Sequence, residues 1–232
     1  MSQSERFLVA FNKIEKFFDQ EIQDSRYVPF HRAVQRLRKS NAVVDRYHND
    51  LLEYSELRNA IVHERTEMNY VIAEPHEKVV QSIEGIASEL TAPKLVIPAF
   101  SKTLKTVQLD LTVKDILAII RETEFTQFPV YRSKQFIGLL TDKQILHWLA
   151  QNINGDCEGL LATSLHDVMK SLEERANYRF ISKSTTVYEA EDCFMKSIRK
   201  HERLDALLIT DEGKSNQRLL GLISPNDLIN IP

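Results

Sequence analysis

Two short segments of the chain place a hydroxyl side chain three residues before a side chain that can accept hydrogen bonds. The first segment holds Thr141 and Gln144, and the second holds Ser224 and Asp227. An ionised carboxylate is only an acceptor, while a helix that starts at such a turn offers free N–H groups and positive potential to an anion. The pattern therefore indicates either a ligand site or simple helix caps, with Ser224 as an N-cap and Pro225 in the first turn.

A third set, Arg58, Asn59 and His63, has the residue types that phosphodiester cleavage needs. Cleaving RNA through its own 2′-hydroxyl requires a base, an acid and cationic support for the transition state. His63 could transfer a proton near neutral pH, Arg58 could hold the phosphate, and Asn59 lies four residues before His63 on the same helical face. One histidine cannot readily make both transfers, so this hypothesis requires a symmetric dimer. The alternative is a polar network at an interface, with Arg58 paired to Glu53 or Glu56.

The elements that carry this third set are helical. The first 84 residues contain no glycine, and apolar side chains recur at steps of three and four residues. One such face comprises Phe7, Leu8, Phe11, Ile14, Phe17 and Phe18. This spacing is typical of an amphipathic helix, and further helices are expected after Pro29, over about residues 43–65 and over 75–90. The sequence predicts an all-α bundle over residues 1–92.

The second half of the chain changes to short apolar strands after a proline-containing, extended boundary at residues 92–100. The runs QFPVY and QFIGLL, a short turn between them, and the helical segment DKQILHWLA form one series. The series returns as ALLIT, a polar turn, RLLGLIS and PNDLI, with Gly138 matching Gly221. Helical segments beginning at Thr112 and Thr186 precede the two series. The fold class is therefore α+β, with two β-α-β-β-α units that should pack against each other.

These repeated segments resemble a tandem cystathionine beta-synthase (CBS) domain pair. The resemblance covers residues 97–232, with one repeat at about 97–154 and the other at about 160–232. It implies a regulatory module that binds an adenosine-containing ligand between the repeats. In the family motif the hydroxyl residue meets phosphate or ribose, and the acid three residues later accepts the ribose hydroxyls.

By this resemblance each cleft joins the turn of one repeat to strands of the other. Asp227 and Ser224 would face Phe125, Thr126 and Gln127. In the other cleft Thr185 would face Thr141 and Gln144, but this copy has a neutral amide where the motif has an acid. We favour the Asp227 cleft because a ribose carboxylate is the harder contact to replace.

The segment LRNAIVHER, which holds Arg58, Asn59 and His63, resembles the R-x4–6-H motif of HEPN domains. Many of these all-helical modules are metal-independent ribonucleases, and the resemblance covers about residues 1–92. Residues 25–44 add a stripe without acids, in which Arg26, Arg32, Arg36, Arg38 and Lys39 could meet RNA phosphates. The same stripe could equally be a solvated helix face.

Composition excludes several other classes. The formal net charge of −3 gives no whole-chain attraction to nucleic acid or membrane. Cys157 and Cys193 are too few for a disulfide framework or a thiolate metal site, and no P-loop, dinucleotide-binding or HExxH motif is present. The amphipathic N-terminus and the lack of a long apolar stretch predict a cytoplasmic location with no membrane contact.

The sequence therefore predicts an adenine-nucleotide-sensing CBS-pair regulatory protein that requires no cofactor and no metal. Its helical N-terminal domain would act as a dimerisation or output module, and the assembly would be at least a homodimer. The alternative is a HEPN-type ribonuclease controlled by nucleotide binding to the CBS pair, with RNA as its partner.

Overall fold

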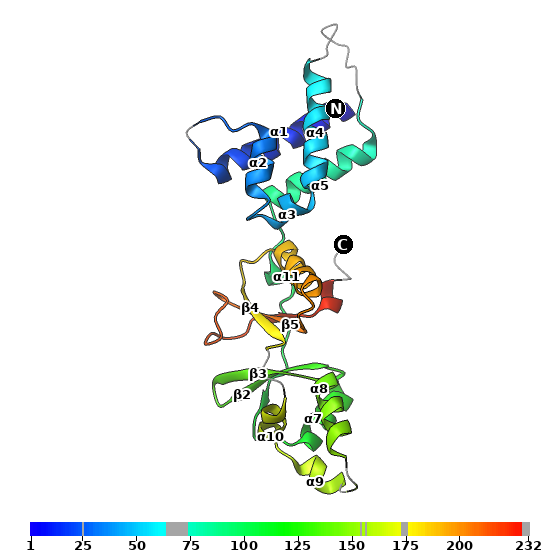
Figure 1. Cartoon of the computed structure of the whole chain (residues 1–232), viewed down its shortest axis with the longest axis vertical. Coiled ribbons are helices and arrows are strands. Elements are labelled where there is room, and N and C mark those ends of the chain that lie inside the picture. Colours follow the sequence, from blue (N-terminus) through cyan, green and yellow to red (C-terminus); the bar gives the residue numbers. More distant parts are fainter. Residues whose placement is uncertain (25, 64–73, 154, 156, 173–175, 229–232) are drawn as a thin grey trace. The chain divides into compact units, whose positions relative to one another are not determined.

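The structure is a computed structural model, and it describes all residues except 25, 64–73, 154, 156, 173–175 and 229–232 (Figure 1). The chain forms two compact units. The first comprises residues 1–94 and 186–192, and the second comprises residues 95–185 and 193–232.

The first unit is helical, as the sequence predicts. Its helices are α1 (Gln3–Ile22), α2 (Phe30–Leu37), α3 (Ala42–Arg46), α4 (His48–His63) and α5 (Glu77–Thr91). The single helix expected over residues 43–65 is divided at Tyr47, whose backbone leaves the helical region at φ −99° and ψ 18°. Asn41 begins α3 by accepting a hydrogen bond from the Val44 N–H group at 3.0 Å.

Aromatic side chains fill the core of the helical unit. The expected apolar face of α1 is buried at Phe7, Phe11, Ile14 and Phe18. The Phe11 and Phe30 rings stack with their centroids 4.6 Å apart. Burial of these rings explains why a helix with charged residues on its outer face docks in one orientation.

The second unit contains two three-stranded sheets with matching order. The first has β1 (Val107–Gln108), β2 (Gln127–Arg132) and β3 (Gln135–Thr141), and the second has β4 (Tyr178–Ser182), β5 (Ala206–Thr210) and β6 (Gly221–Ile223). In each sheet the first two strands are parallel and the last two are antiparallel. A helix connects the parallel pair in both cases, α7 (Val113–Thr123) and α11 (Val187–Arg199). The internal repeat seen in the sequence is therefore present in the strand order.

The two repeats differ where each should end in a helix. After β3 comes α8 (Asp142–Asn152), but after β6 the expected helix is a 3-10 turn, η1 (Pro225–Leu228). The boundary expected to be extended contains a short helix, α6 (Val96–Ala99), although Ile97 within it has extended dihedrals. Two further helices, α9 (Cys157–Ala162) and α10 (Leu165–Ser171), lie between the repeats and have no counterpart among the predicted elements.

Strand β3 contributes to two hydrophobic clusters of the second unit. Leu140 belongs to the cluster of the first repeat, with Phe128, Val130 and Trp148. Its neighbour Leu139 points to the opposite face of the sheet, where it packs with residues of β5 and β6. The two sheets are thus packed together in the way that the repeat requires.

The matching glycines of the repeats give a stability test. A methyl group at Gly221 would collide with the main-chain oxygen of Phe100, whereas one at Gly138 would meet only the flexible end of Met169 at 2.8 Å. We expect Gly221→Ala to lower the free energy of unfolding by about 1–3 kcal/mol, the usual cost of overpacking, and Gly138→Ala to cost less. Urea unfolding of the two variants measures the difference. Equal losses would contradict a rigid approach of Phe100 to β6.

Candidate functional site

The turn between β3 and α8 forms one wall of the candidate site. Thr141 is the N-cap of α8, and its Oγ1 accepts a hydrogen bond from the Gln144 N–H group at 3.2 Å. Gln144 returns the contact, because its Oε1 accepts from the Thr141 N–H group at 3.0 Å and lies 3.2 Å from the Thr141 hydroxyl. The two residues therefore form a capping box at the start of α8.

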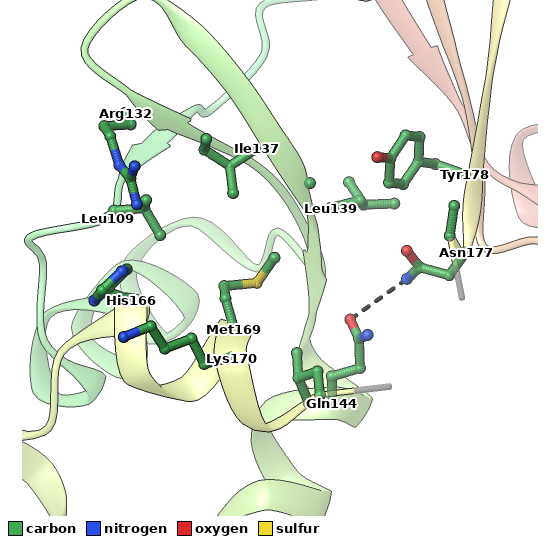
Figure 2. A pocket seen from close by; sticks show the side chains of 13 residues that line it. Leu109, Arg132, Ile137, Leu139, Gln144, His166, Met169, Lys170, Asn177 and Tyr178 are labelled. Atoms are coloured by element: carbon green, nitrogen blue, oxygen red, sulfur yellow. Dashed lines mark hydrogen bonds between the residues drawn. The ribbon is translucent and has the colours of Figure 1, made fainter. Parts of the chain in front are cut away.

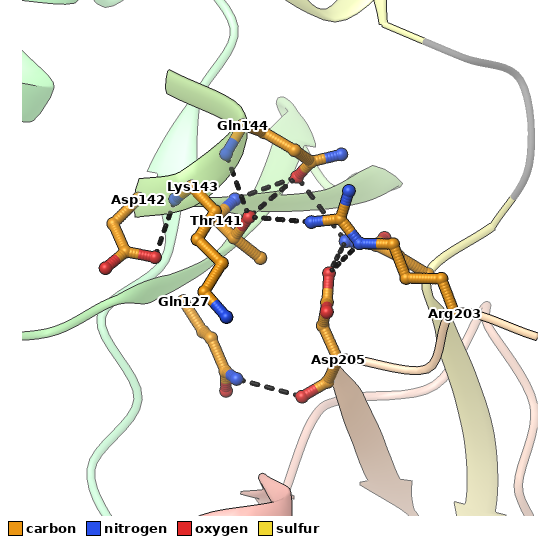
Figure 3. Close-up of polar contacts among 8 residues, drawn as sticks. Gln127, Thr141, Asp142, Lys143, Gln144, Arg203 and Asp205 are labelled. Carbon is orange, nitrogen blue, oxygen red and sulfur yellow. Dashed lines mark hydrogen bonds and ion pairs between the residues drawn. The ribbon is translucent and has the colours of Figure 1, made fainter. Parts of the chain in front are cut away.

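The opposite wall comes from the residues that lead into β4 and β5. Asn177, which is buried, donates from Nδ2 to Gln144 Oε1 at 3.4 Å and to Asp205 Oδ2 at 2.8 Å. Arg203 donates from Nε to Asp205 Oδ2 at 2.9 Å and from Nη2 to Thr141 Oγ1 at 3.5 Å. Figure 3 shows Arg203 and Asp205 of the second repeat beside Thr141 and Gln144. The first repeat's turn is thus tied to the second repeat by polar contacts.

Two cavities meet at this junction. The smaller, about 450 Å³, is lined by apolar side chains that include Ile137, Leu139 and Met169 and by the charged or polar side chains of Arg132, His166 and Lys170. Figure 2 shows Met169 near its centre and the Gln144 to Asn177 hydrogen bond at its edge. The larger cavity, about 770 Å³, also includes Gln144 and Asn177 in its lining. Their volumes lie in the range of small-molecule sites.

The larger cavity is rich in positive charge. Among the described residues that line it, the Lys and Arg side chains are Lys143, Arg179, Lys200 and Arg203, and the carboxylate is that of Glu202. The positive charge of Arg203 is partly neutralised by its ion pair with Asp205. The cavity would therefore attract an anionic ligand.

The second turn, at Ser224 and Asp227, has a different environment. Asp227 Oδ2 accepts from both the N–H group and the hydroxyl of Ser224, each at 2.7 Å, and Oδ1 pairs with Lys102 Nζ at 3.0 Å. Burial acts to raise the pKa of Asp227, but the Ser224 hydrogen bonds and the Lys102 ammonium outweigh it and lower the pKa. The Asp227 carboxylate therefore already has hydrogen-bond and ion-pair partners within the chain.

The sequence predicts that Phe125 and Thr126 face Asp227 and that Thr185 faces Thr141. The Phe125 side chain is 42% exposed, and the Thr126 carbonyl accepts from the Asp142 N–H group at 3.0 Å. Thr185 makes main-chain hydrogen bonds to Ser182 and Val96. Within the part of the chain that the structure describes, the hydrogen bonds to Thr141 and Gln144 from the second repeat come from Asn177 and Arg203 instead.

The sequence analysis missed Asn177, Arg203 and Asp205. Each lies within three residues of the start of β4 or β5, and the Gln127 side chain donates to the Asp205 carbonyl at 2.9 Å. A signal was available, since polar residues immediately before a buried strand lie at the sheet edge where the turns meet.

The ribonuclease candidates lie on α4. Arg58 Nη1 lies 3.5 Å from Asn59 Oδ1, within hydrogen-bond distance. Burial raises the pKa of Glu15 on α1, and the positive charge of Arg58 opposes this rise, so Arg58 has Glu15 as an electrostatic neighbour. His63 is the last residue of α4, and its side chain lies outside the described residues. The proton-transfer role assigned to His63 stays a prediction.

The basic stripe that was a candidate RNA surface is partly neutralised. Arg36 pairs with Asp24 at 3.3 Å, and Arg38 pairs with Asp45 at 3.2 Å. These acids flank the stripe in the sequence, and the folded helices bring them to it. The pairs favour the solvated-face interpretation over RNA binding.

Residues 97–151 match the family model of the CBS domain. The chain therefore contains a CBS domain, in its second unit. A comparison with the curated proteins gives no match. No comparison supports the HEPN resemblance of residues 1–92.

Solved CBS structures are similar to part of this chain. A signal-transduction protein with CBS domains from Burkholderia ambifaria is 22% identical, with a TM-score of 0.41 over 56% of this chain and 82% of its own. A CBS domain pair in complex with 5′-methylthioadenosine and S-adenosyl-L-methionine is 15% identical, with a TM-score of 0.43 over 59% and 94%. A CBS protein in complex with AMP is 16% identical, with a TM-score of 0.42 over 59% and 93%.

The described residues contain no cluster of three or more His, Cys, Asp and Glu residues that could hold a metal ion. Among them there is also no helix of the length and apolar character that a membrane crossing needs.

The lowered pKa of Asp227 predicts a pH-dependent contribution to stability. A carboxylate whose pKa is lower in the folded state stabilises the fold above its unfolded pKa, and this stabilisation is lost as the pH falls through the folded pKa. We expect Asp227→Asn to lower the free energy of unfolding by about 1–2 kcal/mol at pH 7, and by progressively less as the pH falls below the ordinary carboxyl pKa toward the lowered folded pKa. Urea unfolding at several pH values measures this. A difference that is independent of pH would contradict the Lys102 ion pair.

Proposed function

We propose that this chain is a regulatory protein in which residues 97–232 act as a CBS pair that binds an adenine nucleotide. The helical domain, residues 1–92, would be the dimerisation or output module. The CBS domain at residues 97–151 and the matching strand order of the two sheets support this proposal.

The observation that carries the proposal is the junction at Gln144 and Asn177. It combines a cavity with apolar side chains such as Ile137, Leu139 and Met169 on part of its lining, which suit a purine base, with an adjoining cavity lined by cations, which suits phosphate. The turn of one repeat and the strand ends of the other both contribute to it. A ligand bound here would contact both repeats at once and would shift any equilibrium in their packing.

We propose the Thr141 cleft as the nucleotide site in preference to the Asp227 cleft. The sequence favours Asp227 for its carboxylate, but that carboxylate already accepts from Ser224 and pairs with Lys102. A ribose at Asp227 would have to compete with these bonds. Ser224, Phe125, Thr126 and Thr185 would then be structural, while Thr141 would position Gln144.

Nucleotide binding can be tested through Arg203. We expect the full chain to bind ATP in calorimetry and Arg203→Ala to weaken binding by about tenfold, the scale of one hydrogen bond to a charged group. Arg199→Ala is the matched control, because Arg199 is an exposed arginine at the end of α11 that is not part of either cavity lining. GTP should bind more weakly than ATP. The proposal fails if the parent protein binds no adenine nucleotide.

The homodimer can be tested through exposed apolar residues. Leu146 on α8 is 69% exposed and Ile198 on α11 is 64% exposed, and both would be covered in a dimer that also pairs through the second unit. We expect light scattering to give at least a dimer mass, and Leu146→Lys with Ile198→Lys to shift it toward the monomer. A monomer mass for the parent protein at micromolar concentrations would contradict the proposed assembly.

A further inference from the structure

Gln144 stands where the family motif has an acid, and its amide oxygen is fully used. An amide oxygen has two lone pairs, and three donors approach this one. They are the N–H group and hydroxyl of Thr141, at 3.0 and 3.2 Å, and the Asn177 amide at 3.4 Å. The main-chain N–H donor fixes which end of the amide is the oxygen. Gln144 therefore presents a donor, its NH₂ group, to a ligand, and no free acceptor.

Asp205 does not supply the missing acceptor. Its Oδ2 atom receives hydrogen bonds from Asn177 at 2.8 Å and from Arg203 at 2.9 Å. Neither cavity has Asp205 in its lining. Ribose hydroxyls are best recognised by a carboxylate acceptor. Asp205 is held by Asn177 and Arg203, and the carboxylate of Glu202 lies in the larger cavity among its cations, not at the position of the motif's acid.

The larger cavity instead offers donors. Lys143, Arg179 and Lys200 line it and are exposed, and within the described part of the chain they form no ion pair. Three ammonium or guanidinium groups without an acidic partner repel one another and favour a ligand that brings several negative charges. The carboxylate of Glu202 in the same lining offsets only one of them.

We propose that this cleft recognises its nucleotide by the polyphosphate chain and is indifferent to the ribose hydroxyls. This inference rests on the proposed function and names the ligand class as nucleoside di- and triphosphates. The base would lie in the smaller cavity against Ile137, Leu139 and Met169, and the phosphates would lie in the larger cavity against Lys143, Arg179 and Lys200.

The first experiment is a calorimetric series on the full chain with adenosine, AMP, ADP, ATP, 2′-deoxy-ATP and inorganic triphosphate. We expect ATP to bind at least about tenfold more tightly than AMP, with an affinity that falls as salt rises. The 2′-deoxy compound should match ATP within about twofold, since Gln144 replaces the motif's acid and its amide oxygen is already used. Inorganic triphosphate should compete with ATP. Equal binding of ATP and AMP, or loss of binding on removal of the 2′-hydroxyl, would overturn the inference.

The second experiment changes the cleft. Lys200→Ala and Lys143→Ala should each weaken ATP binding severalfold and leave adenosine binding unchanged, while Lys214→Ala, on a turn outside the cavity, should change neither.

Gln144→Asp should weaken ATP binding and improve adenosine binding, since it adds a carboxylate. The capping box should survive, because Asp115 accepts from the Thr112 N–H group at 2.8 Å in the same arrangement. Weakening of ATP and adenosine alike by Lys200→Ala would contradict a phosphate role.

These results separate the two proposals. If ATP and AMP bind equally but more tightly than GTP, the adenine site stands and the polyphosphate inference fails. If GTP and inorganic triphosphate bind as well as ATP, the polyphosphate inference stands and adenine recognition fails.

Discussion

The two-sided burial of β3 is the constraint on which the second unit depends. Side chains alternate between the faces of a strand, so Leu140 enters the core of the first repeat while Leu139 packs against β5 and β6. A slip of one residue would reverse both faces. Because β3 ends at Thr141, this register also places the turn into α8 beside the strand ends of the second repeat.

The polar junction at that turn follows from the register. Thr141 and Gln144 cap α8, and the same Gln144 oxygen accepts from Asn177 of the second repeat. One amide therefore serves both a local helix start and a contact between repeats. The side-chain oxygens of Gln144 and Asp205 therefore accept hydrogen bonds from the chain itself. The ammonium groups of Lys143 and Lys200, which line the larger cavity, stay available to a ligand.

The two turns of the repeat have diverged in opposite directions. At Asp227 the acid is retained, but Ser224 and Lys102 hold it. At Gln144 the acid is absent, and cavities adjoin the turn. Motif matching alone ranks the Asp227 turn higher, whereas the hydrogen bonds around each turn rank the Gln144 turn higher.

The sequence by itself determined the features that depend on local periodicity. Helical spacing at Phe7, Phe11 and Ile14 predicts the buried face of α1, and the echo of Gly138 in Gly221 predicts two sheets with one strand order. Only the tertiary structure decided which groups face each other across the repeats. Lys102 and Asp227 are 125 residues apart, and Arg203 and Thr141 are 62 apart. Such pairs leave no periodic trace in the chain, because packing of two sheets, and not backbone geometry, brings them together.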